Sequence, residues 1–144
     1  MTVTLRAADA ADLAAINARY ADIDFLPSHA GELMVVAEWD GDICGQGRVV
    51  PVGDDSGELG GIFVLPAFEG RGIARSLVDW LILQSRWRVL YCLPFAELAD
   101  FYGEMGFVSV TNDAGVPGAV LEKHRWCQGA YDKPVLLMRR AGLI

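Results

Sequence analysis

Two glycines and two arginines between residues 70 and 75 have the clearest chemical meaning in this sequence. Gly70, Arg71, Gly72 and Arg75 follow the apolar segment 62–65 and open an amphipathic one. Glycine lets the backbone approach an anion with no side chain between them, and the first N–H groups of a helix carry a partial positive charge. The arginines add fixed charge. The run therefore predicts a phosphate-binding turn between a strand and a helix.

Other glycine-rich phosphate sites fit this run less well. A P-loop ends in Gly-Lys-Ser or Gly-Lys-Thr, which is absent here, and the dinucleotide fingerprint has a third glycine where Arg75 stands. A plain strand-to-helix turn that uses glycine only for its geometry stays open, because short glycine motifs match many unrelated chains.

The segments around the turn predict an α/β domain. Asp40-Gly41 is typical of a tight hairpin turn, so strands over residues 33–39 and 43–52 should pair antiparallel, with a third strand over 58–65. Further helices are predicted over residues 10–21, 73–85 and 95–105, and further strands over 3–7, 87–93, 107–110 and 134–140. The order indicates one domain over residues 1–144, an antiparallel meander followed by helix-crossover strands.

Composition and charge exclude several classes of protein. The chain has 144 residues, of which 53% are hydrophobic and 22% charged, so we expect a folded core without disulfide or metal. A net charge of −7 argues against nucleic-acid binding and fits a cationic substrate slightly better than an anionic one. The three cysteines, at positions 44, 92 and 127, lack metal-site spacing and predict reduced thiols.

The sequence carries no signal for a membrane or for secretion. No apolar run reaches the roughly 18–20 residues that a membrane span needs. The first six residues lack the charged start and apolar core of a signal peptide. We therefore expect a cytoplasmic protein with no membrane partner.

Two motifs resemble those of the GNAT family of N-acetyltransferases. The family signature is Gln/Arg-x-x-Gly-x-Gly/Ala after a strand that ends Val-x-Pro, and here it reads Glu69-Gly70-Arg71-Gly72-Ile73-Ala74 after Val64-Leu65-Pro66. The run from Phe101 to Phe107 is similar to the family's Tyr-x-x-x-Gly-Phe helix end. Glu69 departs from the signature, and we expect its side chain to point away from the turn.

The resemblance implies a fold and a donor. The fold would be a mixed, mostly antiparallel sheet of about six or seven strands, flanked by helices and splayed at the strand before the turn. The donor would be acetyl-CoA, with its pyrophosphate held by the amides of Gly70, Arg71, Gly72, Ile73, Ala74 and Arg75. The backbone of Ile62, Phe63 and Val64 would pair with the pantetheine arm. A bulge would free the N–H of Phe63 or Val64 for the thioester carbonyl.

The resemblance also suggests two catalytic side chains. Tyr102 would be the acid that protonates the leaving thiolate, since a phenol has a reference pKa near 10. Glu58 would be the base that deprotonates the acceptor ammonium, directly or through water. Two other interpretations stay open: Tyr102 only packs its ring at a helix end, and Glu58 is a solvated residue at a strand entrance.

Two further segments contain candidate binding residues. Residues 123–134 are loosely similar to the C-terminal part of short N-acetylglutamate-synthase-like acetyltransferases, so Lys123 and Arg125 are candidates to bind a substrate carboxylate; a surface hairpin is the alternative. His29 lies with three carboxylates in a segment that could recognise a cationic amine, or form a solvated loop; the carboxylates are Asp22, Asp24 and Glu32. His124 and Cys127 lack the further ligands of a zinc site.

These observations predict an N-acetyltransferase that uses acetyl-CoA and acts on a primary amine of a small molecule, amino acid or peptide. A catalytically silent acyl-CoA-binding sensor or partner module is the alternative, favoured by Glu69 and by Phe95, where an asparagine is frequent. A nucleotide-binding α/β protein is a weaker third possibility. A homodimer is compatible with the sequence, and no nucleic-acid partner is expected.

Overall fold

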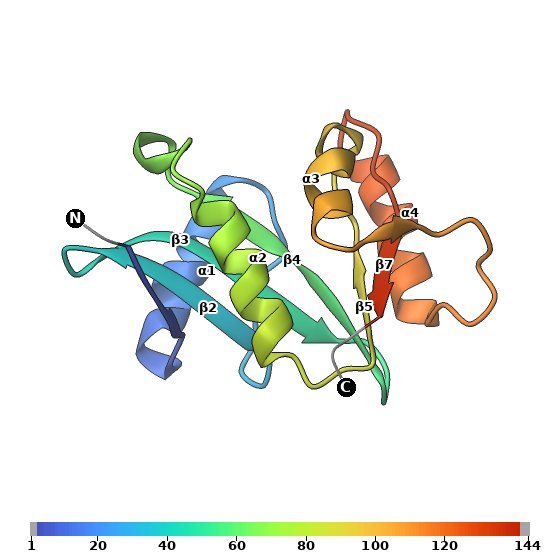
Figure 1. Ribbon diagram of the computed structural model, residues 1–144, viewed down its shortest axis with the longest axis horizontal. Coiled ribbons are helices and arrows are strands. Elements are labelled where there is room, and N and C mark those ends of the chain that lie inside the picture. Colours follow the sequence, from blue (N-terminus) through green and yellow to red (C-terminus); the bar gives the residue numbers. More distant parts are fainter. Residues whose placement is uncertain (1–2, 142–144) are drawn as a thin grey trace. The chain divides into compact units, whose positions relative to one another are not determined.

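The computed structural model describes residues 3–141, in which three consecutive strands, β2 to β4 (residues 33–64), are preceded and followed by segments that contain helices (Figure 1). The strands are β1 (Thr4–Ala7), β2 (Leu33–Trp39), β3 (Asp42–Pro51), β4 (Ser56–Val64), β5 (Val89–Cys92), β6 (Val108–Ser109) and β7 (Met138–Ala141). The helices are α1 (Leu13–Asp22), α2 (Ile73–Gln84), α3 (Ala99–Glu104) and α4 (Gly118–Ala130). Short 3₁₀ turns cover Ala10–Asp12, Pro66–Phe68 and Ala96–Leu98.

Strand pairing gives a seven-stranded sheet over these residues, in the order β1-β2-β3-β4-β5-β7-β6. β4 and β5 pair in parallel, whereas β1–β2, β2–β3, β5–β7 and β6–β7 are antiparallel. The mixed, mostly antiparallel sheet confirms the predicted fold class. Over residues 3–141 the structure has no helix with the length and apolar character to cross a bilayer.

The contacts within the chain define two compact units. Unit 1 runs through Val49 and includes Gly61–Ser85, and unit 2 contains Val50–Gly60 and the chain from Arg86 onward. The boundary divides β4 between Gly60 and Gly61. The glycine turn at residues 70–72 therefore belongs to unit 1, and both candidate catalytic side chains belong to unit 2.

Unit 1 is built on the predicted hairpin of β2 and β3. Asp40 and Gly41 have φ angles of 52° and 84°, the left-handed pair that a two-residue hairpin loop requires. Helix α2 packs against β2 (Figure 1), and it buries five apolar side chains: Ile73, Leu77, Val78, Leu81 and Ile82. A second apolar cluster joins α1 to β2 through Ile16, Tyr20 and Val36.

Unit 2 is built on β5, with the first half of β4 on one side and β7 on the other. The parallel ladder pairs Glu58 with Tyr91 and ends there. The core of this unit contains Tyr91, Val120 and Leu137, so it joins β5 to α4 and to the segment before β7.

The structure corrects three details of the predicted elements. Residues 123–134 do not form a hairpin: most of them belong to α4, which buries Val120 and Cys127 seven residues apart on one face. The last strand begins at Met138 rather than at Pro134, which has no N–H to donate. The predicted helix over 95–105 is a 3₁₀ turn followed by the short α3.

Candidate active site

The glycine turn of unit 1 has the backbone geometry expected of an anion site. Gly70 and Gly72 both have a φ of 78°, a left-handed conformation that glycine adopts without strain. A Cβ atom at either position would meet no heavy atom within 4 Å, so this side of the turn is open. Gly72 is the N-cap of α2, and no side chain caps the helix there. The first N–H groups of α2 lack a side-chain acceptor and are suited to bind an anion.

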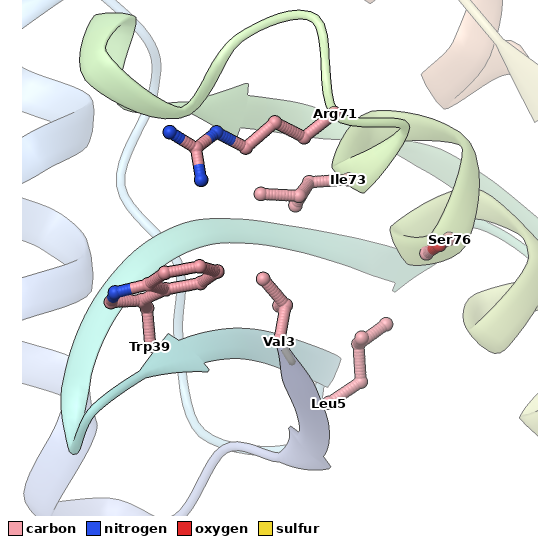
Figure 2. A pocket seen from close by; sticks show the side chains of 6 residues that line it. All are labelled: Val3, Leu5, Trp39, Arg71, Ile73 and Ser76. Atoms are coloured by element: carbon pink, nitrogen blue, oxygen red, sulfur yellow. The ribbon is translucent and has the colours of Figure 1, made fainter. Parts of the chain in front are cut away.

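The side chain of Arg71 is engaged with aromatic rings of the same unit. Its guanidinium carbon lies 5.2 Å from the ring centre of Trp39 and 5.4 Å from that of Phe68. Figure 2 shows Arg71 extended above Trp39, with Ile73 beside it. The backbone of Arg71 thus lies in the turn, whereas its positively charged guanidinium lies against the rings of Trp39 and Phe68.

Arg71, Trp39 and Ile73 border a cavity of about 260 Å³. Its walls combine apolar and polar side chains: Arg71 and Ser76 are the polar members, and the other lining residues are Val3, Leu5, Trp39 and Ile73 (Figure 2). Glu69, which departs from the family signature, is exposed just before Gly70.

The backbone of β4 is irregular just before the residues predicted to pair with pantetheine. Gly61 has a φ of 61° inside the strand, as in a bulge that uses a left-handed glycine. The Tyr20 hydroxyl donates a hydrogen bond of 2.7 Å to the Gly61 carbonyl oxygen. Tyr20 is fully buried, and the Arg48 guanidinium lies 4.4 Å from its ring centre. Helix α1 thus fixes β4 at the residue before Ile62.

Tyr20 and Arg48 are residues that the sequence analysis missed. Burial raises the pKa of Tyr20 to about 12, so its hydroxyl is the hydrogen-bond donor at neutral pH. Arg48 donates hydrogen bonds of 2.8 Å to the Leu26 carbonyl oxygen and to Ser28 Oγ, which ties the loop after α1 to β3. The adjacent glycines 60 and 61 inside a predicted strand were the available signal of an irregularity.

Replacing Gly61 by alanine is expected to destabilise the protein by about 2–4 kcal/mol. The left-handed conformation costs about 1–3 kcal/mol for a residue with a Cβ, and losing the Tyr20 hydrogen bond adds about 1 kcal/mol. The new methyl group would collide with the Tyr20 hydroxyl. Urea unfolding followed by circular dichroism measures the change.

Gly129→Ala is the matched control, because Gly129 lies in α4 and its Cβ would meet nothing within 4 Å. That variant should stay within about 1 kcal/mol of the wild type. Equal stability of the two variants would contradict the account of Gly61.

In unit 2, Glu58 is buried and forms an ion pair. Its side chain is 6% exposed, and Lys123 Nζ lies 2.9 Å from each of its carboxylate oxygens. Lys123 comes from α4 and is 25% exposed. The interpretation of Glu58 as a solvated residue at a strand entrance is wrong, because its side chain is almost completely buried. The interpretation of Lys123 as a residue of a surface hairpin is also wrong, because Lys123 lies in helix α4.

Tyr102 lies on α3 and is also buried. Its ring makes edge-to-face contacts with Phe101 and Phe107, with ring centres 5.0 and 5.7 Å away. Burial raises the pKa of its hydroxyl above the ordinary value, so the phenol stays protonated at neutral pH. The ring therefore does pack at the helix end, and the hydroxyl is in the form that donates a proton.

Two buried thiols belong to the same unit as Glu58 and Tyr102. Burial, and then the negative charge of Glu58, raise the pKa of Cys92. Burial also raises the pKa of Cys127, with Lys123 and Glu58 acting on it in opposite directions. Both thiols are neutral at physiological pH and are poor nucleophiles.

The remaining candidates have structural partners. His124 Nε2 lies 2.7 Å from the Val135 carbonyl oxygen, which ties α4 to the segment before β7. His29 is 77% exposed, and its backbone N–H donates to Glu32 in a loop of unit 1. Within residues 3–141 no group of three or more His, Cys, Asp and Glu side chains is arranged to hold a metal.

Comparisons with known proteins identify the family and the fold. Residues 30–109 match the sequence model of the acetyltransferase (GNAT) domain. No curated protein sequence gives a significant match. Several solved structures match the fold of this chain.

N-acetylglutamate synthase from Neisseria gonorrhoeae, complexed with coenzyme A and N-acetyl-glutamate, superposes with a TM-score of 0.74 at 18% identity. The match covers 100% of this chain and 36% of that enzyme, so this chain spans only about a third of its length. Rv2747 from Mycobacterium tuberculosis, in complex with CoA and a second ligand, gives 0.76 at 21% identity over 97% and 99% of the two chains. A GNAT acetyltransferase from Elizabethkingia anophelis with acetyl-CoA bound gives 0.67 at 15% over 96% and 97%.

Proposed function

Because this chain belongs to the acetyltransferase (GNAT) family, whose sequence model matches residues 30–109, we propose that it transfers an acetyl group from acetyl-CoA to a primary amine. The acceptor is a small molecule, an amino acid or a peptide. The observation that carries the proposal is the open turn at Gly70 and Gly72, with its uncapped helix start. Solved structures with CoA or acetyl-CoA bound share the fold and support the same donor.

Donor binding uses backbone groups of unit 1. The N–H groups from Gly70 to Arg75 hold the pyrophosphate, because the turn has free space at Gly70 and Gly72 and the positive end of the α2 dipole lies there. The backbone of Ile62, Phe63 and Val64 pairs with the peptide-like pantetheine arm as an added strand. Tyr20, through its bond to Gly61, sets the conformation of β4 just before this segment.

The chemistry needs a base, an oxyanion donor and an acid. Glu58 takes a proton from the acceptor ammonium, directly or through water, and the neutral amine nitrogen attacks the thioester carbon. The N–H of Phe63 or Val64 donates to the oxygen that becomes negative. The C–S bond then breaks, and the thiolate takes the proton of the Tyr102 hydroxyl. The nitrogen gives up its second proton, which returns through solvent to the tyrosinate, and the products are free CoA and an amide.

A catalytically silent acyl-CoA-binding module is the second candidate. The observation in its favour is the ion pair of Glu58, since Lys123 Nζ donates to both carboxylate oxygens and occupies the positions where an acceptor ammonium would bind. Such a module would bind acetyl-CoA and release no CoA when amines are added.

An acetyl-CoA assay over a panel of amines separates the two candidates. We expect thiol release that depends on the amine for at least one of four groups: amino acids, polyamines, aminoglycosides and peptide N-termini. The thiol is measured with a chromogenic disulfide, with heat-denatured protein as the control. Binding of acetyl-CoA with no amine-dependent release from any acceptor would replace the enzyme by the silent module.

A further inference from the structure

The ion pair between Glu58 and Lys123 has features that a purely structural contact does not require. It joins β4 to α4 across 65 residues of sequence, and Lys123 Nζ donates to both carboxylate oxygens at 2.9 Å. Glu58 is almost completely buried, whereas a quarter of the Lys123 side chain is exposed. One partner is thus enclosed and the other is in contact with solvent.

A buried ion pair is weak evidence of a stabilising role. The cost of removing two charges from water largely offsets their attraction, so apolar residues of similar size would hold β4 and α4 together at least as well. The unit already has an apolar contact between β5 and α4 through Tyr91 and Val120. The pair therefore requires an explanation other than stability.

The pair also occupies the place that an acceptor ammonium would take. Both oxygens of Glu58 accept hydrogen bonds from Lys123 Nζ at 2.9 Å, so an ammonium group can reach the carboxylate only where Lys123 gives up these bonds. Lys123 then needs another partner. That partner must be an anion, and it must arrive with the acceptor.

A free α-amino acid supplies both charges in one molecule. Its ammonium group replaces Lys123 at Glu58, and its carboxylate replaces Glu58 at Lys123, so two ion pairs form where one breaks. The net charge of the buried region does not change. The flexible, partly exposed stem of Lys123 lets Nζ turn toward the ligand without movement of the backbone.

A polyamine or an aminoglycoside lacks this match. Its cationic group can pair with Glu58, but Lys123 is then left beside it without an anion, and the two positive charges repel each other. An amino-acid amide or ester also lacks the carboxylate that would pair with Lys123. The pair therefore discriminates by the acceptor's carboxylate as well as by its amine.

We propose that Glu58 and Lys123 form a zwitterion-exchange pair that selects free α-amino acids as acceptors, with Lys123 binding the α-carboxylate. This inference rests on the proposed function, because it assigns the acceptor of that reaction. It makes Lys123 the specificity-determining residue. It also makes the Glu58 carboxylate accessible to an amine only in the complex with the correct acceptor.

The test compares acceptors that differ only at the carboxylate. The twenty common L-amino acids are assayed first, and the best of them is then compared with its α-carboxamide and its methyl ester. We expect kcat/KM for the free acid to exceed that for both derivatives by about tenfold to a hundredfold, as for the loss of a charge-assisted hydrogen bond. Equal values for acid and amide in the wild type would overturn the inference.

Two variants of Lys123 assign the preference to this residue. In Lys123→Met the preference for the free acid should fall below about threefold, while in Lys123→Arg, which keeps the charge, it should persist. Lys133→Met is the matched control, because Lys133 forms an exposed ion pair with Glu97 in the same unit. It should keep the wild-type preference.

The outcomes separate this inference from the proposed function. A full carboxylate preference in Lys123→Met would overturn the role of Lys123 while leaving the acetyltransferase intact. No CoA release from any acceptor would instead remove the proposed function. If Lys123→Met does not fold, Lys123→Arg provides the test. Arginine keeps the positive charge, so a loss of the preference for the free acid in a folded Lys123→Arg protein would overturn the role of Lys123.

Discussion

Tyr102→Phe is expected to lower kcat by about 10²–10⁴-fold while the Kd for acetyl-CoA stays within about twofold of the wild type. General acid catalysis contributes a factor of this size, and the substitution removes the proton donor while keeping the ring. The ring contacts with Phe101 and Phe107 remain, so the protein should fold normally. Steady-state kinetics with the best acceptor measures the change.

The pH dependence gives a second readout for Tyr102. Burial raises the pKa of its hydroxyl above the ordinary value of about 10. The acid form therefore persists throughout the usual assay range, and the rate should show no alkaline decline from this group below about pH 10. Tyr131→Phe removes a hydroxyl from the same unit and serves as the control. A loss of less than twofold in Tyr102→Phe would leave the residue with its packing role alone.

Gly72→Val is expected to raise the Kd for acetyl-CoA by about tenfold to a hundredfold. The valine side chain would occupy the open space that faces the turn, where Gly72 now leaves room for phosphate oxygens. Each lost charge-assisted hydrogen bond to a phosphate costs about 1.5–3 kcal/mol, and tenfold in affinity corresponds to about 1.4 kcal/mol. Isothermal titration calorimetry with the folded variant measures the affinity.

Backbone strain is the competing cause of a loss at Gly72, and Gly115→Val controls for it. Gly115 has a φ of 82°, and its Cβ would also meet nothing within 4 Å, but it lies in the loop before α4. Both variants should lose similar stability, and only Gly72→Val should lose affinity. Unchanged affinity in a folded Gly72→Val protein would exclude the turn as the phosphate site.

The parts of the fold that depend on local sequence were predictable. Asp40-Gly41 specifies its hairpin turn because both residues must adopt a left-handed conformation. Gly70 and Gly72 indicate the strand-to-helix turn for the same reason. Such signals lie within a few residues of the structure that they determine.

The contacts that surround the candidate site were not predictable in the same way. The Tyr20 hydroxyl meets Gly61 across 41 residues, and Lys123 meets Glu58 across 65. Both contacts depend on how a helix packs against β4. The sequence of α4 also obscured its helical character, because glycines 118 and 129 at its ends resemble loop residues. The sequence therefore left Glu58 open as a base or a solvated strand residue, because its burial and its pairing with Lys123 depend on a distant helix.

Titration of the wild-type protein with acetyl-CoA, and in parallel with ATP, tests the central claim most directly. The claim is that the turn from Gly70 to Arg75 binds the phosphates of an acyl-CoA donor. The account predicts saturable binding of one acetyl-CoA per chain, weakened in Gly72→Val, and no comparable binding of ATP. Binding of ATP without binding of acetyl-CoA would contradict it and identify the chain as a nucleotide-binding protein.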